Sequence, residues 1–218
     1  MGKTIKRIIR KLWEGLIEVV YPRENYCIIC KEDDCFGICN TCKKSIKIIN
    51  ELYQDEVISY GYYGGVLKDL ILKFKYKNNF TAGDILTEFL EEYIIKNFNY
   101  KEYIITYIPL SKKSKKVRGF NQCEYIAKKI GRDLSIEVLE VLIKQRETKE
   151  QKKLKRDERY ENIKDAFIIK KGIQVKNCNI ILIDDVTTTG ATLQEAYKLL
   201  KKFEVKHIKL LTLAKSHI

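Results

Sequence analysis

The stretch Asn179-Ile180-Ile181-Leu182-Ile183-Asp184-Asp185-Val186-Thr187-Thr188-Thr189-Gly190-Ala191-Thr192 decides the fold. Its four consecutive aliphatic residues predict a strand buried on both faces, as in a parallel sheet. Two carboxylates follow at the end of that strand, which is where ligands bind in open α/β sheets. Residues 191–203 have the apolar spacing of a helix. The hydroxyl-rich loop therefore ends at a helix N-terminus.

The chemistry of this loop suits a phosphorylated sugar. A helix N-terminus offers free N–H groups and the positive end of a dipole to a phosphate. The threonine hydroxyls can add donors, and Gly190 lets the backbone approach closely. Asp184 and Asp185 suit the hydroxyl groups of the sugar, or a hard metal ion that holds it. The alternative reading is a tight strand-to-helix turn in which Asp and Thr act only as caps.

Outside this stretch, strands and helices alternate along the chain. Strands are predicted at about 56–63, 103–108, 138–143, 179–184 and 205–213, and helices at about 66–74, 82–97, 121–132 and 191–203. This alternation predicts an α/β fold with a mostly parallel sheet flanked by helices. The charged residues 144–162 form either a mobile loop or an exposed helix. We expect a boundary near residue 50, with a small domain at 1–50 and the α/β domain at 51–218.

The first residues predict an amphipathic helix over 3–20 that ends before Pro22. Its cationic face allows contact with a membrane or a partner, and the alternative is packing on its own protein. No apolar run approaches the ~20 residues of a membrane span. No signal peptide is recognisable, so we expect a cytoplasmic protein, with peripheral contact at the inner membrane as a further option.

Four of the seven cysteines form two CxxC pairs, Cys27/Cys30 and Cys39/Cys42. In a reducing compartment disulfides are disfavoured, and two such pairs predict a tetrahedral zinc site. Cys35 lies between the pairs and is a possible substitute ligand. The alternative is a set of ordinary buried thiols. Cys123 and Cys178 are predicted to be passive small hydrophobic residues.

The formal net charge of +13 favours polyanionic partners: phosphorylated small molecules, nucleic acid or an anionic membrane. A general bias towards lysine is the alternative source of the charge. Residues 112–164, however, hold 17 Lys and Arg against 9 Asp and Glu. The surplus is therefore concentrated in one part of the chain.

The strand-loop-helix segment resembles the binding motif for phosphoribosyl pyrophosphate (PRPP) of type I phosphoribosyltransferases. The resemblance implies that the two acids contact the ribose hydroxyls, that residues 187–192 cradle the 5′-phosphate, and that Mg²⁺ accompanies PRPP. Thr187 departs from the motif, where an aliphatic residue is usual. The implied PRPP-binding residues are Asp184, Asp185, Val186, Thr187, Thr188, Thr189, Gly190, Ala191 and Thr192.

The whole chain resembles the ComF family of competence proteins. The two CxxC pairs, residues 63–67 (YGGVL) with Lys73-Phe74-Lys75, and Arg118-Gly119-Phe120-Asn121-Gln122 occur in the family's order. A further block is matched by spaced residues: Arg146, Thr148, Gln151, Leu154, Arg159, Asn162 and Phe167. The resemblance implies a type I phosphoribosyltransferase-like domain behind an N-terminal four-cysteine zinc finger.

The basic segment 111–118 has five cations and no acid: Lys112, Lys113, Lys115, Lys116 and Arg118. In the type I fold the corresponding loop faces pyrophosphate, which Arg118 could bind in bidentate fashion. The same cations could line a track for a nucleic-acid backbone, with Phe120 and nearby tyrosines stacking on bases. The third reading is a solvated run of charge.

The family resemblance implies a DNA-uptake factor for natural transformation. It would bind a phosphoribosyl ligand and single-stranded DNA, beside the uptake translocase and helicase at the cytoplasmic side of the membrane. The alternative is an active phosphoribosyltransferase that passes phosphoribose from PRPP to an acceptor and releases pyrophosphate. No residue stands out as a general base, so no catalytic residue is predicted.

Overall fold

The computed structural model describes residues 25–49, 57–148 and 156–216. The helix predicted at 3–20 and part of the charged segment 144–162 lie outside these residues. The chain divides into two compact units, residues 1–43 and 44–218. The boundary predicted near residue 50 lies beside an undescribed stretch and stays a prediction.

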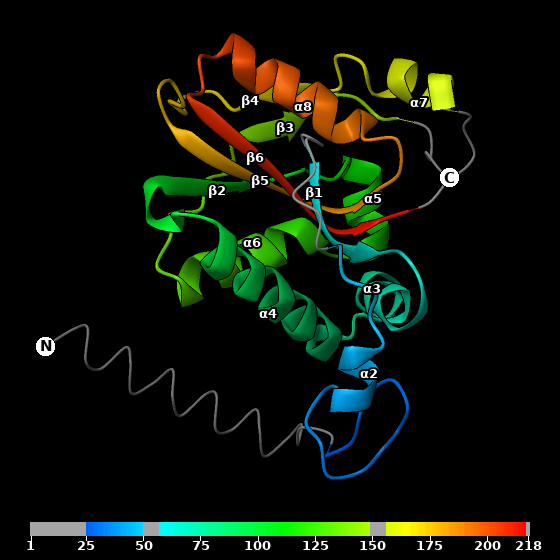
Figure 1. The fold of residues 1–218 in the computed structure, drawn as a ribbon. Helices are drawn as coiled ribbons and strands as arrows, with labels where there is room; N and C mark the ends of the chain where they lie inside the picture. Colours follow the sequence, from blue (N-terminus) through cyan, green and yellow to red (C-terminus); the bar gives the residue numbers. More distant parts are fainter. Residues whose placement is uncertain (1–24, 50–56, 149–155, 217–218) are drawn as a thin grey trace, which may run out of the picture. The chain divides into compact units, whose positions relative to one another are not determined.

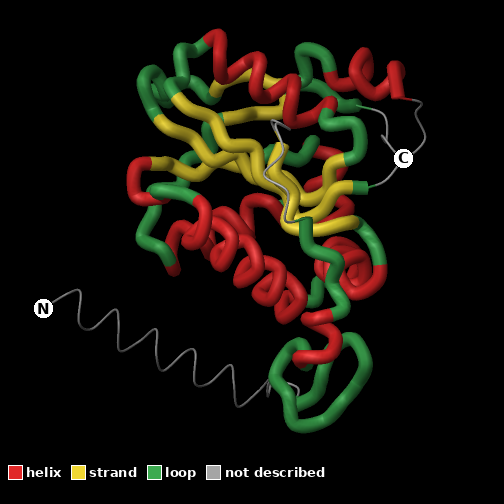
Figure 2. The backbone as a smooth tube through the Cα atoms, in the orientation of Figure 1, coloured by secondary structure: helices red, strands yellow, loops and turns green. Residues whose placement is uncertain are grey.

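The second unit is built on a four-stranded sheet in the order β1-β6-β5-β2. The strands are β1 (Val57–Tyr62), β2 (Tyr103–Tyr107), β5 (Asn179–Thr187) and β6 (His207–Lys215). All neighbouring strands of this sheet run parallel. In Figure 2 these strands form a layer with helices on both sides. The predicted α/β class with a parallel sheet is therefore confirmed.

Helices cover the two faces of the sheet unequally (Figure 1). One face carries α3 (Gly65–Lys77), α4 (Phe80–Asn97) and α6 (Gln122–Asp133). The other carries α8 (Ala191–Lys202), α7 (Arg156–Ile163) and an antiparallel pair of β3 (Leu142–Lys144) and β4 (Phe167–Ile169). A 3₁₀ turn, η1 (Tyr100–Glu102), leads into β2.

Helix α3 is held against α4 by the ring of Phe74. The buried positions of α3 are Leu67, Leu70, Ile71 and Phe74, which follow the spacing of one helical face. A β-carbon added to Gly83 of α4 would lie 2.6 Å from the ring of Phe74. The two helices therefore approach closely because position 83 has no side chain. This contact fixes the C-terminal half of α3, which carries Lys75.

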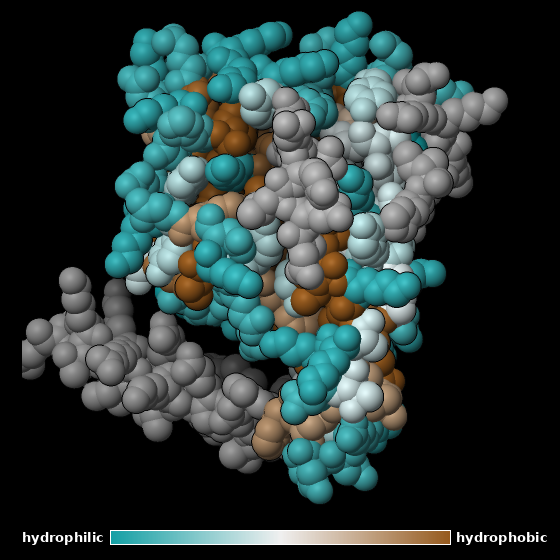
Figure 3. Space-filling model, in the orientation of Figure 1, coloured by the Kyte–Doolittle hydropathy of each residue, from teal (hydrophilic) through white to brown (hydrophobic). Residues whose placement is uncertain are grey.

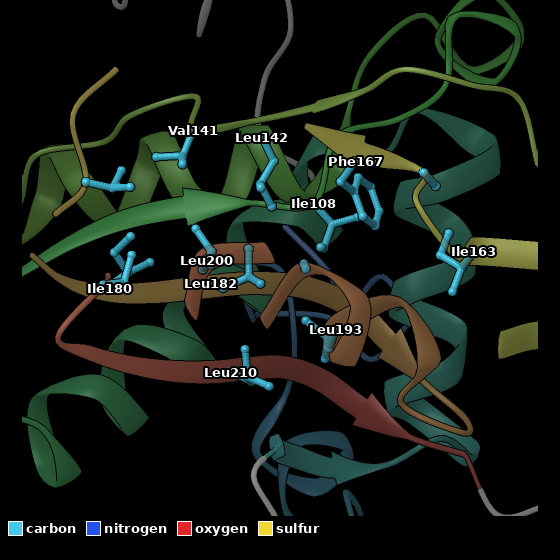
Figure 4. Close-up of a cluster of buried hydrophobic side chains, with 14 of the residues drawn as sticks. Ile108, Val141, Leu142, Ile163, Phe167, Ile180, Leu182, Leu193, Leu200 and Leu210 are labelled. Carbon is cyan, nitrogen blue, oxygen red and sulfur yellow. The ribbon is translucent and has the colours of Figure 1, made fainter. Parts of the chain in front are cut away.

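A second buried cluster fills the space between the sheet and α8 (Figure 4). Ile180 and Leu182 of β5 point into it and are fully buried, as is Leu210 of β6. Leu193 and Leu200 supply the facing side of α8. The cluster thus anchors both the strand that precedes the 188–190 loop and the helix that follows it.

Four local predictions need correction. Residues 112–118, read as a loop, form helix α5 (Lys112–Arg118). Ser111 caps it by accepting a hydrogen bond from the Ser114 N–H, and lysine is a good helix former. Strand β5 continues to Thr187 instead of ending at 184, because β6 pairs with it as far as Lys215. Strand β4 was not predicted, and the strand expected at 138–143 is β3, at 142–144.

The surface of the second unit is mainly hydrophilic on the face seen in Figure 3, where hydrophobic side chains appear as separate patches. Among the described residues, none of the helices has the length and apolar character needed to cross a bilayer. That finding agrees with the lack of a long apolar run in the sequence.

Candidate functional site

The two acids of the predicted sugar site lie at the end of the central strand β5. Asp184 and Asp185 are both partly buried. The Asp184 carboxylate accepts a hydrogen bond from the Asp185 backbone N–H at 2.8 Å, and the Asp185 carboxylate accepts one from the Val186 N–H at 2.5 Å. These contacts fix both side chains beside the strand. The two carboxylates do not cap α8, whereas Thr189 Oγ1 accepts a hydrogen bond from the Ala191 N–H at 3.4 Å, so the capping role fits that threonine and not the acids.

The Asp184 carboxyl holds its proton unusually well. Burial, together with the charge of Asp185, raises its pKa to about 7. Its Oδ1 also accepts a hydrogen bond from the thiol of Cys123, with 3.7 Å between sulfur and oxygen. Burial and the same two acids raise the pKa of Cys123 well above its usual value. Cys123 is therefore a thiol at the site, and the prediction that it is a passive hydrophobic residue was incomplete.

Asp185 is paired with Lys75, which sequence reasoning did not place in the site. Lys75 Nζ lies 2.6 Å from Asp185 Oδ2, and the two side chains are only 13% and 16% exposed. Burial acts to lower the pKa of Lys75, but the charge of Asp185 and their hydrogen bond raise it overall. The lysine therefore stays charged. Its position within Lys73-Phe74-Lys75 was the available signal.

The loop Thr188-Thr189-Gly190 joins β5 to α8 and has the shape of an anion cradle. Gly190 is the residue before the first turn of α8 and has a φ of 78°, a conformation that favours glycine. A β-carbon there would meet nothing closer than 4.0 Å, so the space above the backbone is open. No side chain of residue 190 can cap the helix. The Ala191 N–H donates a long hydrogen bond of 3.4 Å to Thr189 Oγ1, which a phosphate at this helix N-terminus would replace.

Two residues of helix α7 form hydrogen bonds with this loop. Arg159 donates a hydrogen bond from Nη1 to Thr188 Oγ1 at 2.7 Å. The Tyr160 hydroxyl donates to the Thr189 carbonyl at 2.7 Å. A cation and an aromatic hydroxyl therefore lie against the predicted phosphate loop. Both residues come from the charged segment 144–162. From residue 156 onward this segment forms helix α7, which agrees with the exposed-helix alternative.

The lysines of α5 are exposed to solvent, and its last residue lies near Lys75. The four lysines are exposed: Lys112, Lys113, Lys115 and Lys116. Arg118 is partly buried, donates to Gln122 Oε1 at 3.2 Å, and is close enough to Lys75 for its charge to act on the lysine pKa. Glu147 accepts a hydrogen bond from the Lys113 N–H at 3.1 Å. The helix thus has a fixed start and a dense positive surface.

Aromatic rings lie next to this positive helix. Phe120 packs on Phe80, with 5.2 Å between ring centroids, and the Arg118 guanidinium lies 5.7 Å from the Tyr76 ring centroid. Tyr76 is 54% exposed and Phe80 is 47% exposed. Exposed rings beside cations are the combination that single-stranded nucleic acid uses for stacking and phosphate contact.

The first unit brings the four predicted zinc ligands together. The sulfur atoms of Cys27, Cys30, Cys39 and Cys42 all lie within 4.8 Å of one another. Cys30 and Cys39 have their sulfurs 3.6 Å apart, against about 3.8 Å expected for a tetrahedral ion with 2.3 Å bonds. Cys35 is outside the group, and its thiol donates to the Glu32 carbonyl at 3.7 Å.

The chemistry of this cluster fits a metal that takes thiolates. Although burial acts against ionisation, N–H groups of Cys30, Cys39 and Ile29 lower the pKa of Cys27 to about 6. The pKa of Cys42 is raised by burial and by hydrogen bonds with its neighbouring thiols. Four converging sulfurs, one already biased to the thiolate, could hold a metal ion such as zinc. Cys27, Cys39 and Cys42 would supply buried ligands and Cys30 an exposed one.

A family model for the phosphoribosyl transferase domain matches residues 121–218. These residues include β5, the 188–190 loop and α8. Together with the parallel sheet flanked by helices, the match confirms the type I phosphoribosyltransferase-like fold. Two solved structures are similar over part of the chain. They are a purine phosphoribosyltransferase from Pyrococcus horikoshii (19% identity, TM-score 0.39, 62% of this chain and 79% of that one) and the adenine phosphoribosyltransferase of Leishmania tarentolae (16%, 0.40, 66% and 74%).

Curated relatives are competence proteins. The chain is 35% identical over 153 residues to competence protein ComFC of Streptococcus pneumoniae, covering 70% of this chain and 65% of that protein. It is 28% identical over 211 residues to competence protein F of Haemophilus influenzae, covering 83% and 91%. ComFC of Bacillus subtilis is 29% identical over 158 residues, with 71% and 62% covered. The chain thus spans slightly less than two thirds of the two ComFC proteins.

Proposed function

Because the chain belongs to the ComF family of competence proteins, we propose that it is a DNA-uptake factor for natural transformation. It binds PRPP, or a related phosphoribosyl ligand, at the end of β5, and single-stranded DNA on the surface of α5. Mg²⁺ enters the site with PRPP. It acts beside the uptake translocase and helicase, at the cytoplasmic face of the inner membrane.

One observation carries the sugar-phosphate assignment: the acid pair of β5 leads directly into an open loop at the N-terminus of α8, where residue 190 has no side chain. Asp184 and Asp185 offer acceptors to ribose hydroxyls. Gly190 leaves room for a phosphate over the first turn of the helix. Acceptors and donors therefore follow each other in the order that a 5-phosphorylated sugar requires.

The test of this site is calorimetry with PRPP and Mg²⁺ on the full chain. Asp185→Asn and Thr189→Val should each weaken binding at least tenfold, since they remove an acceptor for the sugar and a donor for the phosphate, each worth roughly 1.5 kcal/mol or more when charge is involved. Thr81→Val, at the exposed start of α4, is the matched control and should leave the affinity unchanged. Equal affinities in all four proteins contradict the assignment.

The DNA part of the proposal rests on the exposed lysines of α5 and the neighbouring rings of Tyr76, Phe80 and Phe120. Each lysine that contacts a phosphate should add about 0.7 to the salt dependence of single-strand binding. Replacing the four lysines of α5 by Gln should lower that slope. Four lysines of and after α8, Lys198, Lys201, Lys202 and Lys206, provide a control of equal charge. If the slope falls only in the control variant, the DNA binds another surface, and the assignment to α5 is wrong.

The second candidate function is an active phosphoribosyltransferase. It is favoured by the contact of Arg159 with Thr188, because a cation over the phosphate loop could stabilise negative charge during transfer. Pyrophosphate release from PRPP, measured over a broad set of acceptors, distinguishes the two. Release that requires an acceptor and disappears in Asp185→Asn would establish turnover.

A further inference from the structure

Lys75 brings a buried positive charge to one of the two carboxylates proposed to receive the sugar. Its Nζ lies 2.6 Å from Asp185 Oδ2, with little of either side chain exposed. The preceding residue, Phe74, is buried between helices and packs on Phe120 with 5.2 Å between ring centroids. Helix α3 is therefore held firmly at this point. The ion pair is built into the fold and is not a chance contact of two mobile side chains.

Without Lys75, the end of β5 would have the ligands of a divalent cation site. Cys123 Sγ and one carboxylate oxygen from each of Asp184 and Asp185 lie within 4.8 Å of one another. Paired carboxylates at such separations are the oxygen ligands that Mg²⁺ and Mn²⁺ take. Lys75 already forms an ion pair with Asp185. Its charge lies within a few ångströms of the position that an ion would take, so it opposes binding of a second cation.

We propose that Lys75 is the resident cation of the phosphoribosyl site. In the ligand-free protein it neutralises Asp185 and keeps free divalent cations away from the acid pair. An ammonium group has three N–H donors, and the bond to Asp185 uses one. The others can be donated to an oxygen of the bound ligand. Lys75 is thus a positioning residue that also selects how a metal enters the site.

This inference rests on the proposed function only for the ligand. A divalent cation would reach the site bound to the phosphates of PRPP, which bring their own oxygen ligands. A ligand without pyrophosphate, such as ribose 5-phosphate, would bind with no added metal. Exclusion of free cations is a property of the protein alone and is tested without any sugar.

The experiment is a titration of the full-length, zinc-loaded protein with Mn²⁺, followed by the electron paramagnetic resonance signal of the free ion. Wild-type protein should bind Mn²⁺ no more tightly at this site than the control Lys77→Met. That control removes the same charge from the exposed end of α3. Lys75→Met should bind one Mn²⁺ at least ~10 times more tightly, because both carboxylates become available. The double variant Lys75→Met with Asp185→Asn should return to the wild-type value.

Lys75→Gln is the second neutral variant, chosen because its amide can still donate a hydrogen bond to Asp185 and so preserves the local packing. It should also gain Mn²⁺ affinity, whereas Lys75→Arg should not. Tight Mn²⁺ binding by the wild-type protein, or the same weak binding in the Met and Gln variants, would overturn the inference.

The role of Lys75 in ligand binding is tested by calorimetry with ribose 5-phosphate and no added metal. Wild type and Lys77→Met should bind it, and Lys75→Met should bind it at least tenfold more weakly. Unchanged affinity in Lys75→Met would overturn the part of the inference that concerns the ligand. If wild type binds neither ribose 5-phosphate nor Mg²⁺-PRPP, the proposed function fails, while the Mn²⁺ titration still decides whether Lys75 excludes free cations.

Discussion

Replacing Asp184 by Asn should stabilise the protein at alkaline pH while impairing the proposed sugar site. The folded protein raises the pKa of this carboxyl to about 7 from its ordinary value of 3.8, through burial and the charge of Asp185. A raised carboxyl pKa means that the folded state binds the proton more tightly than the unfolded state does. Ionisation of Asp184 therefore costs stability as pH rises above about 4, and the cost is complete above pH 7.

The size of the effect follows from the shift. A difference of about three pKa units corresponds to about 4 kcal/mol, since one unit is about 1.4 kcal/mol. Asp184 is partly exposed at the residue level, so solvent screening reduces this to roughly 2 kcal/mol. Asn keeps an oxygen that can accept the Asp185 N–H and the Cys123 thiol. It removes the charge without removing these contacts, so the ionisation cost should disappear.

The assay is denaturant unfolding of wild type and Asp184→Asn at pH 8 and pH 5. At pH 8 the variant should be more stable by about 2 kcal/mol, and at pH 5 the difference should shrink to well under half of that, because less of the ionisation cost has built up. Asp69→Asn, an exposed position of α3, should change stability by less than about 0.5 kcal/mol at both values. A variant that is less stable than wild type at pH 8 would refute the reasoning.

Two further predictions concern the four-cysteine cluster and the α3–α4 contact. Purified protein should contain one zinc per chain, and Cys39→Ser should lose most of it whereas Cys178→Ser should not; a zinc content near zero in wild type rules out the site. Gly83→Ala should lower the free energy of unfolding by about 1–3 kcal/mol, because the new methyl meets the ring of Phe74, as measured by denaturant unfolding. Gly64→Ala, where a β-carbon meets nothing within 4 Å, is the control, and equal losses in both variants would contradict the packing argument.

Local patterns were enough to predict the main parts of this fold. The aliphatic run Ile180–Ile183, the acids after it and the periodic helix beyond them indicated a strand that ends in two acids and then a helix, and the structure has these elements in that order. The spacing of the two CxxC pairs likewise indicated a four-cysteine cluster, which the structure contains. Such features are predictable because the physical signal lies within a few neighbouring residues.

Tertiary structure decided how far these elements extend and what surrounds the acids. Strand β5 runs on to Thr187 because β6, from a later part of the chain, pairs with it. Residues 112–118 are helical partly because Glu147, more than thirty residues away, accepts a hydrogen bond from the start of α5. No pattern local to either segment contains that information.

The sequence by itself thus determined the fold class, the order of the elements and the residue types of the sugar-phosphate loop. Only the tertiary structure set Lys75 against Asp185 and the Cys123 thiol against Asp184, a contact that spans 61 positions of the chain. Packing brings α3 and α6 to the end of β5, and the resulting burial shifts the pKa values of groups that look ordinary in sequence. The residues of the proposed site could be named from the sequence, whereas its electrostatics came from contacts made only in the folded chain.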